Sequence, residues 1–138
     1  MSTRIGFVGL GTMGTVMCQR LMGAGYALTV WNRSEAAGAA LMKAGATWAG
    51  SPREVAAAAD VVFSMVTDAA ASQAVICGPG GLLDGVHPGL IIIDSASIMP
   101  EASQAIAERV TAAGAVMLDA PVSGGPKVAA EGRLGIMV

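Results

Sequence analysis

Short apolar runs alternate with longer, alanine-rich stretches along the whole chain. The runs are continuously apolar rather than alternating with polar residues, which is typical of parallel strands covered on both faces. The stretches between them have the composition and apolar spacing of helices. We therefore expect strands at 5–8, 28–31, 61–65, 90–94, 116–119 and 134–138, and helices at 12–24, 35–44, 52–58, 69–76 and 100–113.

Capping and stop residues support several of these helices. Ser51-Pro52-Arg53-Glu54 has the form of a capping box with proline in the first turn, and Asp68 precedes Ala69 as a candidate N-cap. Gly45 and Gly114 follow predicted helix ends, where glycine is the usual stop residue. Alternation of strands and helices predicts right-handed βαβ units. The expected fold class is therefore α/β: a Rossmann-type, doubly wound, mainly parallel sheet in three layers.

Composition limits the function classes. The chain has 138 residues, 54% of them apolar and 13% charged, with a formal net charge of −2. We expect one ordered domain over 1–138, with no bulk charge for binding nucleic acid or a membrane surface. Cys18 and Cys77 form no CxxC pair and have no histidines nearby in sequence, so the sequence predicts no metal site. Both fit a reduced, cytoplasmic protein.

A glycine-rich segment follows the first predicted strand. Gly9-Leu10-Gly11-Thr12-Met13-Gly14 is a GxGxxG motif between a strand and a helix, the context that dinucleotide-binding domains require. Gly9 would permit the tight turn, Gly11 would let the backbone approach a pyrophosphate, and Gly14 would let the helix lie close to the strand. Amide N–H groups at the helix start would then hold the phosphates without a lysine.

Two other interpretations of this motif remain open. A plain glycine turn joining a strand to a helix would have the same residues. A Rossmann domain that binds S-adenosylmethionine or a flavin nucleotide would also share the motif. A P-loop nucleotide hydrolase is excluded because the motif lacks the lysine that such a loop requires.

The residues after the second predicted strand bear on the choice between NADP and NAD. The position that usually holds an acidic residue for the ribose 2′-hydroxyl is occupied by Asn32, followed by Arg33 and Ser34. A carboxylate would repel a 2′-phosphate, whereas a guanidinium can bind it through charge-assisted hydrogen bonds. Ser34 is also placed to cap the helix predicted at 35–44. The hypothesis is a preference for NADP, with NAD possible.

With both ends of the chain in view, the sequence resembles the β-hydroxyacid dehydrogenases, which include 3-hydroxyisobutyrate dehydrogenase, tartronate semialdehyde reductase and, more distantly, 6-phosphogluconate dehydrogenase. Three segments carry the resemblance, and it covers essentially the whole chain. They are Gly6-Phe7-Val8 with the glycine motif, Asp94-Ser95-Ala96-Ser97 with Pro100, and Asp119-Ala120-Pro121-Val122-Ser123-Gly124-Gly125 continued by Ala129, Gly132, Leu134 and Met137.

The resemblance implies further roles, residue by residue. Val66 and Thr67 would line the nicotinamide half of the cofactor, and Ser97 would lie near the nicotinamide ribose. Ala96 replaces the serine usual in the family, so any contact of that side chain is lost. Ser123, Gly124 and Gly125 would bind the acid group of the substrate, which agrees with the capacity of a hydroxyl and glycine N–H groups to form an anion-binding nest. A plain connection between two elements is the alternative for this segment.

The resemblance also implies a helical C-terminal domain that is absent from this chain. The family's proton-donating lysine would lie beyond Val138, and neither Lys43 nor Lys127 fits its position. We therefore expect no catalytic residue in this chain and little turnover by it alone. The resemblance implies that the full-length protein is a homo-oligomeric, NADP(H)-dependent oxidoreductase that interconverts a short 3-hydroxy acid and its aldehyde or keto form. A non-catalytic dinucleotide sensor or scaffold and an imine reductase are the alternatives.

Overall fold

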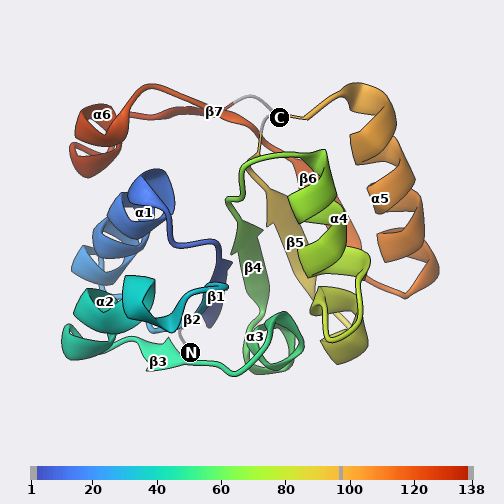
Figure 1. Ribbon diagram of the computed structural model, residues 1–138, viewed down its shortest axis with the longest axis horizontal. Helices are drawn as coiled ribbons and strands as arrows, with labels where there is room; N and C mark the ends of the chain where they lie inside the picture. The colour runs from blue at the N-terminus through green and yellow to red at the C-terminus, as the bar shows by residue number, and fades with distance from the viewer. Residues whose placement is uncertain (1–2, 97, 137–138) are drawn as a thin grey trace.

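The computed structural model describes residues 3–96 and 98–136 and contains a six-stranded parallel sheet (Figure 1). The strand order is β3-β2-β1-β4-β5-β6, which reverses direction between β1 and β4. The strands are β1 (Ile5–Val8), β2 (Leu28–Trp31), β3 (Thr47–Trp48), β4 (Val61–Ser64), β5 (Ile91–Asp94) and β6 (Val116–Asp119). The predicted Rossmann-type fold is confirmed. In such sheets, ligands bind beyond the carboxyl ends of the strands, where the order reverses.

Helices cover both faces of the sheet. The helices on the two faces are α1 (Thr12–Gly23), α2 (Ala39–Lys43), α3 (Pro52–Ala58), α4 (Ala69–Cys77) and α5 (Pro100–Ala112). On one face, Phe7 of β1 packs in a buried cluster with Cys18 of α1 and residues of α2. On the other, Val62 of β4 packs in a second cluster with Val55 of α3 and Ile76 of α4. The sheet is thus the middle of three layers, because successive strand residues point to opposite faces.

One part of the sheet is exposed on the face that α1 and α2 cover. The strand register aligns Ile5, Val61, Ile91 and Val116 along that face. Val116 is 56% exposed and Leu118, two residues further along β6, is 40% exposed. Apolar side chains at such exposure form an uncovered surface at the β6 end of the sheet.

The predicted capping residues take the expected positions. The Ser51 hydroxyl accepts a hydrogen bond from the Glu54 N–H at 3.3 Å, and Glu54 Oε2 accepts one from the Gly50 N–H at 2.6 Å. Asp68 Oδ1 accepts a hydrogen bond from the Ala71 N–H at 2.8 Å. Gly45, at φ 117°, follows the end of α2 in the left-handed region that stop glycines occupy.

Two predicted elements differ from the structure. The helix expected at 35–44 is divided into a 3₁₀ turn, η1 (Glu35–Gly38), and α2; at Gly38, where the two meet, a Cβ would be 2.7 Å from the Trp48 ring. The strand expected at 134–138 is not part of the parallel sheet. The structure has β8 (Gly135–Ile136), paired antiparallel with β7 (Val122–Ser123) outside the main sheet. Residues 137 and 138 lie outside the described residues.

Four short elements were not predicted. They are β3, β7, a second 3₁₀ turn η2 (Leu82–Gly85) and helix α6 (Pro126–Ala130). Each has five residues or fewer, too short for a hydrophobic period to be recognisable. The sequence therefore did not predict where the turn between β3 and α3 lies, or where the chain runs after β6, and both bear on the site.

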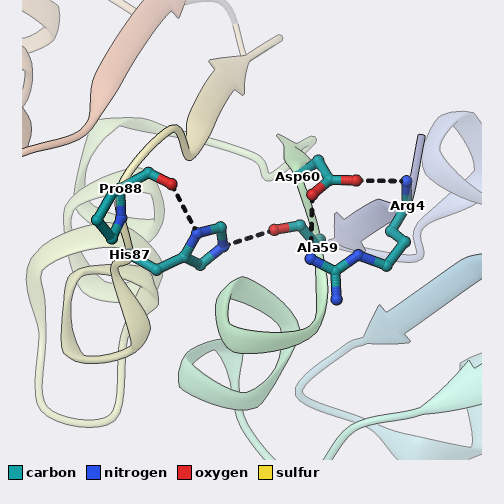
Figure 2. Close-up of polar contacts among 5 residues, drawn as sticks. All are labelled: Arg4, Ala59, Asp60, His87 and Pro88. Carbon is teal, nitrogen blue, oxygen red and sulfur yellow. Dashed lines mark hydrogen bonds and ion pairs between the residues drawn. The ribbon is translucent and has the colours of Figure 1, made fainter. Parts of the chain in front are cut away.

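Polar contacts tie the amino ends of β1, β4 and β5 together (Figure 2). The Arg4 N–H and guanidinium donate to the Asp60 carboxylate at 2.9 and 3.0 Å, and these bonds lower the pKa of Asp60. His87 Nε2 lies 2.7 Å from the Ala59 carbonyl oxygen, and Nδ1 lies 3.1 Å from that of Pro88. His87 is therefore a loop residue at the amino edge of the sheet, opposite the glycine motif.

Candidate nucleotide-binding site

A cavity of about 620 Å³ opens at the carboxyl edge of the sheet, where the strand order reverses. Its lining comes from the chain just after β1, β2 and β4, from the turn before α3 and from one side of α4. Six of the predicted cofactor-binding residues line it: Gly9, Gly11, Asn32, Arg33, Val66 and Thr67. Residues far apart in the sequence therefore meet in one cavity.

The glycine motif forms a tight turn between β1 and α1. Gly9 has φ 99°, and a Cβ there would overlap the carbonyl oxygen of Met65. A Cβ at Gly14 would overlap the carbonyl oxygen of Gly9, so both positions require glycine. A Cβ at Gly11 would meet nothing within 4 Å. The backbone at Gly11 therefore faces open space in the cavity, which a side chain would reduce.

Helix α1 begins at this turn without a side-chain cap. Gly11 is the N-cap residue and offers no side chain to the first-turn N–H groups, those of Thr12 and Met13 among them. The Thr15 hydroxyl donates a hydrogen bond to the Leu10 carbonyl at 3.1 Å, which joins the first turn of α1 to the glycine turn, and the Leu10 side chain is buried. Free N–H groups and the positive end of the helix dipole together can bind an anion.

Asn32 supports the glycine turn. Its Oδ1 accepts a hydrogen bond from the Leu10 N–H at 2.9 Å, and its Nδ2 donates to the Ser34 carbonyl at 3.1 Å. Arg33 is exposed at the cavity and forms no salt bridge with any described residue. Ser34 occupies the N-cap position of η1, yet within the described chain its hydroxyl makes no capping hydrogen bond. Arg33 and Ser34 are therefore the groups with free polar atoms here.

The structure describes three of the four residues discussed for the nicotinamide side of the site. Val66 is half-buried and Thr67 exposed, and both line the cavity after β4. Ala96 is buried after β5, so its methyl group faces protein rather than the cavity. Ser97 lies outside the described residues, and its predicted role therefore stays a prediction.

The predicted substrate segment lies over the same edge of the sheet but outside the cavity. After β6, the chain runs through β7 across the carboxyl edge to α6, which packs beside α1 (Figure 1). Ser123 and Gly124 are exposed on this segment, and Gly125 is half-buried. The structure therefore brings the segment to the side of the sheet that holds the glycine turn.

The cavity also has lining residues that the sequence did not identify. The turn before α3 contributes Gly50, Ser51 and Pro52, and α4 with its following turn contributes Ala71, Ala74, Val75, Pro79 and Gly80. Ser51 stands out in sequence only as a helix cap. Its place in the cavity depends on β3, whose two residues pair with β2 and bring the turn to the site.

Neither cysteine is part of the cavity, and both are free thiols. Burial raises the pKa of the Cys18 thiol to about 12, which makes it unreactive at neutral pH. In the part of the chain that the structure covers, no three His, Cys, Asp or Glu side chains gather as metal ligands. Over those residues, too, every helix is too short or too polar to cross a bilayer.

A doubly wound parallel sheet with an uncapped, glycine-lined helix start at its switch point defines a nucleotide-binding Rossmann domain. The chain belongs to the family described as the NAD binding domain of 6-phosphogluconate dehydrogenase, whose model matches residues 4–138. The resemblance to β-hydroxyacid dehydrogenases found in the sequence is thereby confirmed.

Relatives of known description include enzymes and a nuclear factor. The chain is 40% identical over 136 residues to mitochondrial 3-hydroxyisobutyrate dehydrogenase of Mus musculus, covering 99% of this chain and 41% of that protein. It is 35% identical over 134 residues to the cytokine-like nuclear factor N-PAC of Danio rerio, covering 97% of this chain and 29% of that protein. The chain thus spans less than half the length of these relatives.

Solved structures share the fold closely. Psf3 in complex with NADP+ and 2-OPP has a TM-score of 0.91 at 34% identity, covering 96% of this chain and 47% of that one. 3-Hydroxyisobutyrate dehydrogenase of Mycobacterium tuberculosis with L-serine has a TM-score of 0.91 at 33% identity, covering 99% and 46%. An imine reductase from Pseudomonas sp. has a TM-score of 0.82 at 28% identity, covering 93% and 44%.

Proposed function

We propose that this domain binds NADP(H) for hydride transfer between a short 3-hydroxy acid and its aldehyde or keto form. The observation that carries the proposal is the uncapped start of α1 at Gly11, open to a cavity that has Arg33 at its edge. The nicotinamide ring supplies or accepts the hydride when bound. The residues of this chain bind and orient the reactants.

The diphosphate would lie on the glycine turn. Gly11 leaves the space that a diphosphate needs, and the N–H groups of Thr12 and Met13 have no side-chain cap to satisfy them. Gly9 and Gly14 allow the close backbone contacts of this turn, and the Leu10 N–H donates a hydrogen bond to Asn32 Oδ1, which braces the turn. This division of roles explains how a chain of net charge −2 can bind a phosphorylated ligand by local geometry.

The 2′-phosphate of the adenosine ribose would be bound by Arg33 and Ser34. Arg33 is exposed at the cavity and unpaired among the described residues, so binding a phosphate breaks no existing salt bridge. The Asn32 Oδ1 already accepts a hydrogen bond from the Leu10 N–H, and the uncharged amide, unlike a carboxylate, does not repel the phosphate. Support for NADP also comes from Psf3, which was solved with NADP+.

The nicotinamide and the substrate would lie toward β4, β5 and the crossing segment. Val66, Thr67 and Ser97 would line the nicotinamide half, and Ser123, Gly124 and Gly125 would bind a small anionic group of the substrate. Gly124 has φ 118°, so this segment has a backbone bend that favours glycine next to an exposed hydroxyl. Such bends expose N–H groups that bind anions.

The proton at the substrate oxygen would come from a second, helical domain. No described residue of this chain is placed as a general acid at the cavity, and the relatives are more than twice as long. The exposed Val116 and Leu118 offer an apolar surface for further chain to cover. We expect the full-length protein to be a cytoplasmic homo-oligomer, and the 138-residue chain to bind cofactor with little turnover.

A non-catalytic nucleotide-binding domain is the second candidate. The similarity to N-PAC, described as a nuclear factor, favours it. The two candidates differ at Ser123–Gly125, which a domain without a substrate does not need. An imine reductase is a third possibility on fold alone, and the serine and glycines of that segment argue against it.

Calorimetric titration of the chain with NADPH and NADH tests the proposal. We expect NADPH to bind at least tenfold more tightly, since a charge-assisted contact to the 2′-phosphate contributes about 1.5–3 kcal/mol. Arg33→Gln should remove this preference. Arg53→Gln is the matched control, because Arg53 is exposed on α3 and its side chain does not line the cavity. Equal affinity for both nucleotides in the wild-type chain would refute the NADP preference.

A further inference from the structure

Ser51 has a hydroxyl at the cavity whose proton is donated to no described residue. Ser51 lines the cavity between Gly50 and Pro52 and is half-buried. Its hydroxyl oxygen accepts a hydrogen bond from the Glu54 N–H at 3.3 Å, which makes Ser51 the N-cap of α3. A hydroxyl can donate one hydrogen bond while it accepts others. The capping bond therefore leaves the Ser51 O–H free to bind a ligand.

The N–H groups that follow Ser51 in α3 are already engaged. Pro52 has no N–H group, and the Glu54 N–H donates to Ser51. The Arg53 N–H donates to the Gly80 carbonyl at 2.9 Å, a bond that joins this helix start to the turn after α4. Helix ends usually bind ligands through unbonded N–H groups, which these are not. The side-chain hydroxyl, rather than the helix end, is therefore the available donor.

The strand pairing brings Ser51 to the same part of the cavity as Arg33. Strands β2 and β3 are parallel neighbours in which Val30 is paired with Trp48. The Ala49 N–H donates to the Val30 carbonyl at 2.9 Å and continues this pairing toward the cavity. The same register, extended to the carboxyl edge, brings Arg33 level with Ser51, and both residues line the cavity. Two neighbouring strand ends thus direct a guanidinium and a hydroxyl to one region.

The charges around Ser51 favour an anion. Of the described residues that line the cavity, Arg33 is the charged one and none is acidic. Glu54 lies outside the lining, and its carboxylate accepts a hydrogen bond from the Gly50 N–H at 2.6 Å. A phosphate group has three terminal oxygens, and a guanidinium fork binds two of them. A phosphate held by Arg33 thus has an oxygen left for a neighbouring hydroxyl.

We propose that Ser51 is a specificity-determining residue, whose hydroxyl donates a hydrogen bond to the 2′-phosphate of NADP(H) while its oxygen caps α3. The inference rests on the proposed function, which assigns that phosphate to Arg33. NADH has a hydroxyl in place of the phosphate, and a hydrogen bond to a neutral group is weaker than one to an anion. Ser51 therefore contributes to the choice between the nucleotides, whereas the glycine turn binds the diphosphate of both.

Two substitutions separate the hydroxyl from the helix cap. Glycine is a good N-cap residue and alanine a poor one, so Ser51→Gly keeps most of the stability of α3 and Ser51→Ala does not. Both variants lose the hydroxyl. Because the hydroxyl acts on the phosphate, the two variants should lose the same nucleotide preference although they differ in stability. Urea unfolding measures the stability, and calorimetry measures the affinities.

The ligands are NADPH and NADH, with adenosine 2′,5′-bisphosphate and adenosine 5′-monophosphate as a second pair that differs only in the 2′-phosphate. In both variants, the ratio of affinities within each pair should fall roughly tenfold from its wild-type value, since a hydrogen bond to a charged group is lost. The affinity for NADH should stay close to that of the wild type. Ser51→Thr keeps a hydroxyl and a good cap, and should retain the preference.

Glu54→Ala is the matched control. It removes the bond to the Gly50 N–H and so weakens the same helix start, yet it leaves the Ser51 hydroxyl in place. Glu54 does not line the cavity. The variant should be less stable than the wild type, and its preference for NADPH should not fall. A helix that affects binding only through its stability would instead lower the affinity for both nucleotides in Ser51→Ala and Glu54→Ala alike.

Two results would overturn the role of Ser51 alone. One is a Ser51→Gly variant that keeps the full wild-type preference for NADPH while Arg33→Gln loses it. The other is a Glu54→Ala variant that loses as much of the preference as Ser51→Gly does. A wild-type chain that binds NADPH and NADH equally would overturn the NADP preference and the role of Ser51 together. A wild-type chain that binds neither nucleotide would overturn the proposed function as a whole.

Discussion

The Oδ1 atom of Asn32 accepts a hydrogen bond from the Leu10 N–H at 2.9 Å, and this contact joins the end of β2 to the glycine turn after β1. The two residues are 22 positions apart in the sequence. The contact shows why an amide at position 32 can serve two purposes. It braces the turn that would hold the diphosphate, and it leaves the nearby space without a negative charge.

Asn32→Asp should separate these two purposes. A carboxylate keeps an acceptor for the Leu10 N–H but would repel a 2′-phosphate, by about 1–4 kcal/mol for charges some 4 Å apart at the protein surface. We expect NADPH affinity to fall roughly tenfold or more while NADH affinity is maintained or improved. Fluorescence titration with both nucleotides measures this. Parallel losses for NADPH and NADH would contradict the proposed selection.

Two glycine variants should behave in opposite ways. Gly14→Ala places a methyl group against the Gly9 carbonyl and should destabilise the fold by about 1–3 kcal/mol. Gly11→Ala meets no protein atom within 4 Å, so its stability should stay within about 0.5 kcal/mol of the wild type. Its affinity for NADPH should nevertheless fall, because the methyl group occupies the space proposed for the diphosphate.

Urea unfolding and calorimetry of both variants test this pair. A Gly11→Ala chain that is as stable as the wild type and binds NADPH equally well would refute the placement of the diphosphate. A fully stable Gly14→Ala chain would show that α1 can move away from β1.

The main sheet could be predicted because its strands are long, continuous apolar runs. Val61–Ser64 and Ile91–Asp94, for example, are buried between helices on both faces, and this burial determines their composition. Thr47–Trp48 could not be predicted, because two residues form a strand here only through their pairing with β2. The antiparallel pairing of Gly135–Ile136 with Val122–Ser123 likewise depends on tertiary contacts rather than on local pattern.

The candidate site was predictable where a short motif determines the backbone. The glycine turn and the residues after β2 belong to this group. The burial of Asp94 and its hydrogen bond with Ser64 could not be predicted, since that bond joins β4 and β5 in space. The same holds for Ser51, whose place in the cavity follows from β3.

Asp94→Asn should change how stability depends on pH. Because burial raises the pKa of Asp94 in the folded state, the unfolded chain loses this proton at lower pH than the folded chain does. Wild-type stability should therefore decline as the pH rises above the ordinary aspartate range and until the folded-state pKa is passed. The asparagine variant should lack this contribution. Urea unfolding at several pH values measures the difference, and parallel curves would contradict a raised pKa.

The two thiols should differ in reactivity. Cys18 is completely buried and its pKa is raised to about 12, whereas Cys77 is half-buried and Arg109 partly offsets the effect of burial on its pKa. At mildly alkaline pH, a thiol reagent should label Cys77 slowly and Cys18 only after unfolding. Mass spectrometry of the labelled native chain checks this. Rapid labelling of Cys18 would show that α1 separates from the sheet.

The most direct test of the account is a proton–nitrogen NMR titration of the 138-residue chain with NADP+. We expect the amide signals of Gly11, Thr12 and Met13 to shift on binding, together with those of Arg33 and Ser34, while amides at the opposite edge of the sheet, such as that of Asp60, stay in place. Unchanged signals at the start of α1 in the presence of saturating NADP+ would contradict it.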